Sequence, residues 1–262
     1  MASADVPRSG RFIEPNPATK AVELQNDVLS GYQEKLGPEF GSLFYYIRAD
    51  VVTLRQSWRI YRSMFSTNPE RFALLYSVSK ATTRVLERAL FDQVVISVRR
   101  ITDPATRGKN RNISIAAFVD HIGEVSQKAE LEKLLAAATE AAEIVRVFAD
   151  KRIAHSDVDV RYESKEIAVS RAKINAAIDA IANVFKWIGR TQLDTIFVTH
   201  LIIDVDDEVR LLQHLYEGQI SMKNKKIKEL ELVHEGKFKE IKALHHYPDW
   251  LSERPERIYD YV

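Results

Sequence analysis

The sequence contains no cysteine, and it has only nine glycines and eight prolines among 262 residues. The missing cysteines exclude disulfides, thiolate metal sites and cysteine nucleophiles, and they are typical of proteins from a reducing cytoplasm. So few glycines and prolines leave little material for turns. This favours long uninterrupted helices over a turn-rich sheet.

A strong charge of one sign and long apolar runs are also missing. The formal net charge is +1, which argues against a chain that coats nucleic acid with its whole surface but allows a local basic patch. No apolar run approaches the roughly 20 residues that a membrane span needs. The opening MASADVPRSGRF lacks the apolar core of a signal peptide. We therefore expect a cytoplasmic protein with no membrane partner.

Several motifs that mark cofactor and metal sites are absent as well. The chain has no GxxxxGK[ST] phosphate loop, no HExxH and no GxSxG. The pair His245–His246 with Asp249 is a weak metal signal, because adjacent histidines on a helix point in different directions. We expect no cofactor and no metal site.

What the sequence does contain is apolar residues at helical spacing along most of its length. Asn68-Pro69-Glu70 is a helix start signal, and Ser114, Ser126 and Ser170 are further candidate N-caps. Residues 195–205 are β-branched and fit either a strand or a buried helix. The predicted helices span residues 21–36, 41–65, 69–101, 114–122, 126–155, 170–188, 206–215 and 220–244.

These elements predict an all-α fold, an antiparallel bundle of long helices with additional C-terminal helices. We expect a flexible lead at 1–19, the helical bundle at 20–190 and a C-terminal helical extension at 191–262. Within 223–242 there are seven lysines and four glutamates. Such a mixture usually forms a solvated helix face, although it also suits binding to a protein partner.

The stretch KRIAHSD, residues 151–157, ends the long predicted helix 126–155. Arg152 and His155 are three positions apart and therefore share a helix face. A histidine there is able to move a proton to or from an RNA 2′-hydroxyl or leaving oxygen, while an arginine holds the phosphate. The simpler interpretation is that cations at a helix end complement the helix dipole.

A second polar cluster surrounds the end of the predicted helix 69–101 and the loop that follows. Five of its eight residues are cations, which suits phosphate binding. The alternative is a solvated loop in which Arg99 pairs with Asp103. The cluster comprises Arg99, Arg100, Asp103, Arg107, Lys109, Asn110, Arg111 and Asn112.

Three segments together resemble the HEPN superfamily, and more narrowly its AbiU-type abortive-infection branch. They are FDQVVISVRRITDP (91–104), NISIAAF (112–118) and DKRIAHSD (150–157), and the resemblance covers about residues 20–190. It implies an all-α bundle that often dimerises. In catalytic members of the family, one Arg and one His cut RNA without a metal ion. It also implies a role in phage defence or toxin–antitoxin systems, with a homodimer, RNA and an antitoxin or other protein as expected partners.

His155 matches the family's motif histidine, and Ala154 matches its usual small neighbour. The motif arginine should precede the histidine with about four to six residues between them, which places both on one helix face. Those positions hold Phe148, Ala149 and Asp150, so no arginine stands there. Arg146 is nine positions before His155, beyond that spacing.

Two functions therefore stay open. In the first, a metal-independent ribonuclease with a degenerate motif uses His155 as acid or base, while Arg152 and Lys151 contact phosphate. Arg99, Arg100 and Asn110 are then further candidates for substrate contact. In the second, the chain is a non-catalytic dimerisation and interaction module, and its Lys-rich C-terminal helix binds a partner.

Overall fold

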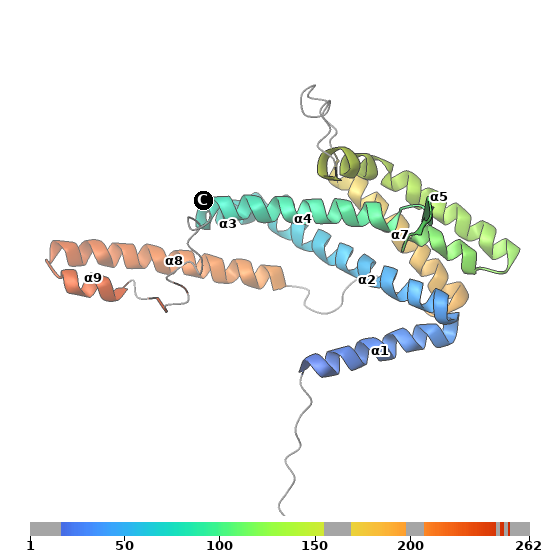
Figure 1. The fold of residues 1–262 in the computed structure, drawn as a ribbon. Helices are drawn as coiled ribbons and strands as arrows, with labels where there is room; N and C mark the ends of the chain where they lie inside the picture. The colour runs from blue at the N-terminus through green and yellow to red at the C-terminus, as the bar shows by residue number, and fades with distance from the viewer. Residues whose placement is uncertain (1–16, 155–168, 198–206, 245–246, 249–250, 252–262) are drawn as a thin grey trace, which may run out of the picture. The chain divides into compact units, whose positions relative to one another are not determined.

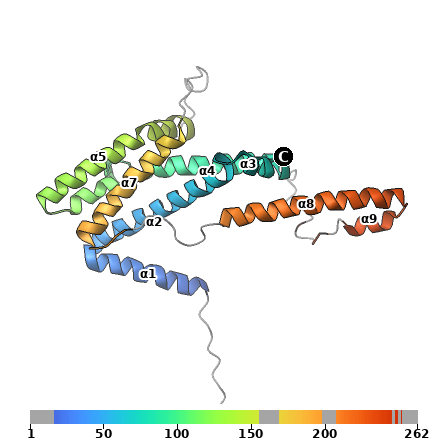
Figure 2. The ribbon, with the colours of Figure 1, turned by 180° about the vertical axis from the view of Figure 1, so that it is seen from behind.

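The computed structural model describes residues 17–154, 169–197, 207–244, 247–248 and 251. These residues form helices almost throughout, as predicted, and their only β-structure is a two-stranded antiparallel hairpin (Figures 1 and 2). The elements are α1 (Pro17–Leu36), α2 (Pro38–Tyr61), the π-helix η1 (Arg62–Ser66), α3 (Pro69–Val78), α4 (Lys80–Ile101), β1 (Thr106–Arg107), β2 (Asn110–Arg111), the 3-10 helix η2 (Ile115–His121), α5 (Val125–Phe148), the π-helix η3 (Ala149–Ala154), α7 (Arg171–Gln192), α8 (Asp207–His234) and α9 (Phe238–Leu244).

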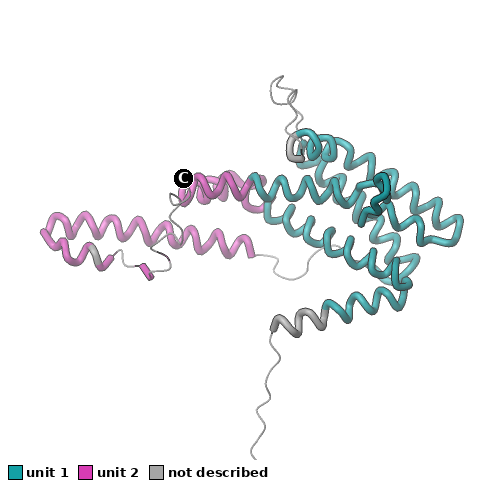
Figure 3. Tube along the Cα trace, viewed as in Figure 1, with its two compact units in different colours: residues 1–61, 88–205 teal, residues 62–87, 206–262 magenta. Residues whose placement is uncertain are grey.

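The chain divides into two compact units, drawn in different colours in Figure 3. Unit 1 comprises residues 1–61 and 88–205, and unit 2 comprises residues 62–87 and 206–262. The division falls inside α4. Residues 62–87 therefore group with the C-terminal residues, although the prediction from sequence assigned them to the bundle of residues 20–190.

Unit 1 has an extensive apolar interior. Helices α5 and α7 lie side by side in both views of the ribbon, and small buried residues such as Ala138 and Ala177 let their backbones approach closely (Figures 1 and 2). Three fully buried rings from α2, η2 and α7 meet at the centre. Phe44, Phe118 and Phe185 have centroids 5.3 to 6.1 Å apart.

Helices α1 and α2 form a hairpin that meets at one end and diverges toward the other (Figures 1 and 2). Close to the turn, Gly41 of α2 lies against the backbone of α1. A Cβ atom at Gly41 would come within 2.5 Å of backbone atoms of Tyr32 and Gln33. Glycine at this position is therefore what allows the two helices to touch.

Several predicted helix starts are confirmed. The Asn68 side chain accepts a hydrogen bond from the Arg71 N–H at 3.1 Å, and Ser170 accepts one from Lys173 at 3.3 Å. Ser126 is not the cap of the next helix. Instead, Glu124 accepts the capping bond from the Gln127 N–H at 2.7 Å.

The prediction of one continuous helix over 69–101 is wrong. The helix breaks at Ser79, whose backbone is extended at φ −156° and ψ 94°. The Thr83 hydroxyl donates to the carbonyls of Leu75 and Ser79, at 2.9 and 2.7 Å. The backbone N–H groups of Ser79 and Thr83 still donate to the same two carbonyls, both at 3.0 Å, so the Thr83 hydroxyl adds hydrogen bonds across the break.

The C-terminal helices also differ from their predicted bounds. The two helices expected at 206–215 and 220–244 are divided differently. Helix α8 runs without a break through the first and most of the second, and α9 follows a turn at Gly236, where φ is +69°. Residues 195–197 are neither strand nor helix, and the rest of the ambiguous segment 195–205 lies outside the described residues.

Unit 2 consists of η1, α3, the start of α4, α8 and α9. Helix α3 packs on α8, and Gln219 donates a hydrogen bond to the Ser77 hydroxyl at 2.6 Å. Few apolar side chains are buried here, among them Met64, Leu75 and Leu212. Several large apolar side chains along α8 remain exposed, namely Leu211, Tyr216, Ile220, Met222, Ile227, Leu230 and Val233.

Candidate functional site

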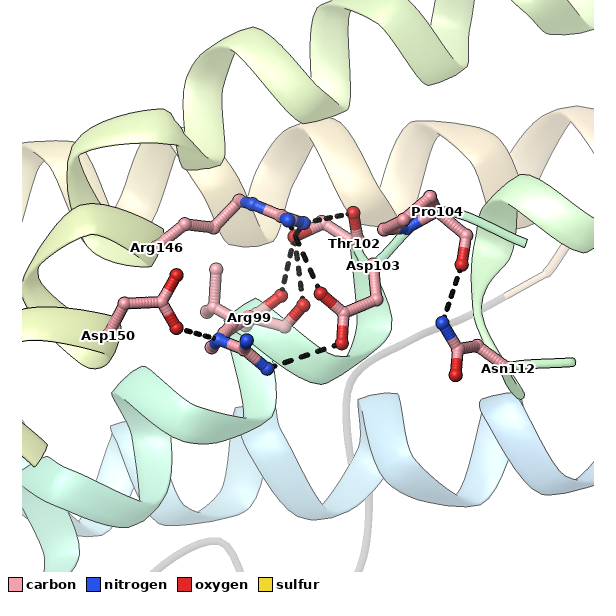
Figure 4. Close-up of polar contacts among 8 residues, drawn as sticks. Arg99, Thr102, Asp103, Pro104, Asn112, Arg146 and Asp150 are labelled. Atoms are coloured by element: carbon pink, nitrogen blue, oxygen red, sulfur yellow. Dashed lines mark hydrogen bonds and ion pairs between the residues drawn. The ribbon is translucent and has the colours of Figure 1, made fainter. Parts of the chain in front are cut away.

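The charged residues near the end of α4 form a network with residues of α5 and η3 (Figure 4). A terminal nitrogen of Arg99 lies 3.3 Å from Asp103, one turn further along the chain. The Arg99 Nε also donates to the Asp150 carboxylate of η3. On its other side, Asp103 lies 3.3 Å from a terminal nitrogen of Arg146 on α5. Two guanidinium groups and two carboxylates therefore alternate within unit 1.

Arg146 also stabilises the end of α4. Its other terminal nitrogen donates to the backbone carbonyl of Thr102, and the Thr102 hydroxyl donates to the Val98 carbonyl at 2.8 Å. The last carbonyls of a helix have no partner within the helix, and a cation near them also complements the helix dipole. Arg146 thus connects α5 to the end of α4 through both a carboxylate and a carbonyl.

Most of the charged network is withdrawn from solvent. The side chains of Arg99, Asp103 and Arg146 are only 19 to 22% exposed, while Asp150 is 44% exposed. Charges that are mostly withdrawn from water need their counter-ions, because an unpaired one retains its desolvation cost. The two acids therefore hold both arginines in fixed positions.

Arg100 points away from this network, as adjacent residues on a helix do not share a face. Its guanidinium lies 3.1 Å from Asp50 on α2, and its side chain is 61% exposed. Arg99 and Arg100, proposed as one substrate-binding pair, are therefore directed toward different helices. The alternative prediction of an Arg99–Asp103 pair is confirmed.

Asn110 lies in β2 of the short hairpin that follows α4, and its side chain is exposed. It pairs in register with Arg107 of β1 across a turn at Gly108. The base of the hairpin is held by Asn112, whose side chain donates to the Pro104 carbonyl at 2.8 Å (Figure 4). The hairpin thus presents polar side chains next to the end of α4.

Two of the residues predicted to carry the chemistry, Lys151 and Arg152, belong to η3, which follows α5 directly. Lys151 is in η3 and is exposed. Arg152 also belongs to η3, but its side chain lies outside what the structure describes, and so does the whole of His155. Their predicted roles therefore stay predictions.

Sequence reasoning assigned no role to Arg146, which lies beyond the family's spacing from His155, and noted Asp150 only as a position that lacks the motif arginine. The structure places a guanidinium directly against Asp150, and Arg99 of α4 supplies it. The sequence did contain a signal that Arg146 and Asp150 belong to one cluster: they are four residues apart, and residues at this spacing lie on one face of a helix.

The described part of the chain contains neither a cluster of metal ligands nor a helix that suits a membrane span. No group of three or more His, Asp or Glu side chains there is arranged to hold a metal ion. None of the helices in the same part combines the length and the hydropathy that crossing a membrane requires.

Comparison with known proteins gave one match. The family model HEPN_AbiU2, described as AbiU2, matches residues 37–211, which include α2, the whole charged network and the start of α8. No curated protein and no solved structure matches the chain.

Proposed function

The chain belongs to the HEPN_AbiU2 family, and from this membership we propose that it is an RNA-directed defence or toxin-type HEPN protein that cuts RNA without a metal ion. The family name links it to abortive infection, the form of phage defence that the sequence resemblance also implies. The proposed reaction needs one group that moves protons and cations that hold the phosphate.

In this proposal, His155 moves the protons. A bond forms between the RNA 2′-oxygen and phosphorus while the bond from phosphorus to the 5′-oxygen breaks. The 2′-hydroxyl loses a proton and the 5′-oxygen gains one, so acid–base catalysis assists both halves of the step. Arg152 and Lys151, just before His155, contact the phosphate, and Arg99, Arg100 and Asn110 contact the flanking RNA.

The observation that carries the proposal is the ion pair between Arg99 and Asp150. Asp150 occupies one of the positions where the family pattern has its arginine. In this protein the guanidinium beside that position comes from α4. Arginine is suited to this role because its planar fork matches the oxygens of a phosphate. An arginine from a neighbouring helix thus lies beside the position where the motif lacks its arginine.

A second function is favoured by a different observation. Asp103 and Asp150 neutralise both partly buried arginines of the network, which makes it a plausible structural clamp with no catalytic role. The exposed apolar side chains on α8 then suit a protein partner, such as a second copy of the chain or an antitoxin. Under this alternative, the protein is a non-catalytic dimerisation and interaction module.

Cleavage of RNA by the purified protein in EDTA separates the two functions. We expect the native chain to cut, and His155→Ala to cut on the order of 100-fold more slowly or worse, since the proton-transfer group is lost. Arg99→Gln and Arg152→Ala should each slow cleavage. Arg88→Gln is the matched control, because Arg88 is 76% exposed on α4 and pairs only with nearby Asp92 among the contacts described.

Circular dichroism, urea unfolding and the measured oligomeric state should show each variant folded and assembled like the native chain. No cleavage by the native chain on RNAs of varied sequence and structure would contradict the nuclease and leave the interaction module. Cleavage that His155→Ala retains in full would instead exclude His155 from the reaction.

A further inference from the structure

Unit 1 contains a cavity of about 430 Å³ that is separate from the charged network. It is lined by the second half of α1, by α2 and by the residues that follow α7. Tyr32 and Lys35 line it from α1, Arg48 lines it from α2, and Phe197 is the last described residue of its third wall. Sites for small molecules have volumes of about 300 to 1,000 Å³, so this cavity is large enough for one.

The third wall is firmly held against the core. The Thr195 N–H donates to the Gly189 carbonyl at 2.8 Å, so the chain turns back on α7 at once. A Cβ atom at Gly189 would lie 2.9 Å from the Phe197 Cβ, and glycine permits this close return. The Phe197 ring packs on Phe44 and Phe185 at 5.4 and 5.9 Å. The cavity is therefore built on the aromatic centre of unit 1.

The charge inside the cavity has one sign. Among the described residues that line it, Lys35 and Arg48 are cations and none is acidic. The Arg48 guanidinium carbon lies 5.5 Å from the centroid of the Phe197 ring, and the ring face holds it in place. This arrangement attracts an anion to the mouth of an otherwise apolar cavity.

Arg48 also has an unsatisfied donor. Its Nε is buried and has no hydrogen-bond partner in the described structure. A buried N–H without an acceptor costs stability. The two terminal nitrogens of the guanidinium form a fork that matches both oxygens of a carboxylate or two of a phosphate.

Two other arginines of α2, Arg55 and Arg59, do not line the cavity. Arg55 differs further because Asp179 of α7 lies 3.7 Å from its guanidinium. Arg48 is therefore the α2 arginine whose side chain contributes to the cavity wall.

We propose that this cavity binds a small organic anion, in which a carboxylate or phosphate joins a flat apolar body. The anionic group would pair with Arg48 and Lys35, and the flat body would lie along Tyr32 and the apolar wall. This binding activity does not depend on RNA cleavage, because the described residues proposed for cleavage lie on α4, β2 and η3.

The test uses two anions and their neutral counterparts with the full-length native protein. Adenosine 5′-monophosphate is compared with adenosine, and 2-naphthoate with 2-naphthylmethanol, by isothermal titration calorimetry. We expect at least one anion to bind about tenfold more tightly than its neutral counterpart, since the counterpart leaves the Arg48 fork unpaired. Binding of the phosphate alone or of the carboxylate alone identifies the head group.

Arg48→Gln should weaken binding of that anion about tenfold, and Arg48→Lys should also weaken it because lysine keeps the charge but has no fork. Arg88→Gln, which changes an exposed arginine elsewhere in unit 1, should bind like the native protein. Urea unfolding checks that the Arg48 variants are folded. If Arg48→Gln does not fold, Arg48→Lys alone provides the test.

The proposal is overturned if neither anion binds better than its neutral counterpart, or if folded Arg48 variants bind as the native protein does. His155→Ala, which is expected to lose cleavage, should retain anion binding in full. A failure of the cavity proposal is therefore distinguishable from a failure of the proposed nuclease.

Discussion

Units 1 and 2 consist of similar helices but differ in how much of their surface they bury. In unit 1, Phe44, Phe118 and Phe185 are fully buried. In unit 2, the side chains of Tyr216, Ile227 and Leu230 on α8 are each more than half exposed. Burial of apolar surface supplies most of the free energy of folding. The difference implies that unit 1 is stable mainly through its own interior, whereas unit 2 depends on a few contacts between α3, α8 and α9.

The ion pairs differ between the units in the same way. The network of Arg99, Asp103 and Arg146 in unit 1 is about four-fifths buried. In unit 2, the pair of Arg210 and Asp207 is 60% and 73% exposed. Exposed pairs contribute little because water and salt screen them, whereas breaking a buried pair leaves a charge without compensation. We therefore expect substitutions in unit 1 to have the larger effects.

The largest effect is expected from removing a central ring of unit 1. Phe185→Ala should lower the free energy of unfolding by about 3–5 kcal/mol, because it leaves a cavity among packed rings. Leu212→Ala, in the smaller cluster of unit 2, should cost about 2 kcal/mol, the lower end for such a change. Urea unfolding measures both values.

Hydrogen exchange then tests whether the two regions are independent. Leu212→Ala should speed exchange in α3 and α8 and leave α5 and α7 protected, because loss of local contacts opens local segments first. Equal loss of protection in α5 and α7 would show that the stability of unit 1 depends on unit 2, contrary to this comparison.

An intermediate effect is expected from the charged network. Asp103→Asn removes the carboxylate between two guanidinium groups and should cost about 1–3 kcal/mol, since both cations remain mostly buried. Arg210→Gln, the corresponding change at an exposed pair of unit 2, should cost about 0–1 kcal/mol. Urea unfolding at low and high salt measures both, and equal losses would remove the distinction between the two kinds of pair.

The smallest effect concerns the start of α5 in unit 1. Hydrogen bonds from the Ser126 hydroxyl, and then from the Gln127 and Ser126 backbone N–H groups, lower the pKa of the Glu124 carboxyl below its ordinary value. A carboxylate whose pKa falls on folding stabilises the fold above the ordinary glutamate pKa, and this contribution is lost as the pH falls through the lowered pKa.

Amide exchange in the first turn of α5 should therefore become less protected in acid, and Glu124→Gln should remove most of this pH dependence. The exposed acid Glu132, on the same helix but away from its start, provides the control variant Glu132→Gln. A first turn whose pH dependence survives Glu124→Gln unchanged would show that another group controls it.

Much of the helical structure was predictable from short stretches of sequence. Asn68 and Ser170 were recognised as caps because a capping side chain acts within three residues of its own position. The same local reasoning failed at Ser79, where the extended backbone divides the expected helix, and at Ser126, where Glu124 two residues earlier caps instead. In both places several polar side chains compete for the same backbone groups, and periodicity does not decide among them.

The candidate site depended on the tertiary structure to a greater degree. The sequence indicated that Arg99 and Arg100 are cations near a helix end, but it did not indicate that Arg99 meets Asp150, 51 residues away, while Arg100 meets Asp50. Arg48 was not recognised as a candidate, because its position at a cavity without an acidic side chain depends on the helices around it. The all-α class and most helix starts follow from the sequence, since they depend on local hydrogen bonds and the 3.6-residue period. The family follows from the resemblance of three segments. The partners of each charge, and the space beside Arg48, were decided only when the helices packed, because burial and ion pairing depend on residues that are distant along the chain.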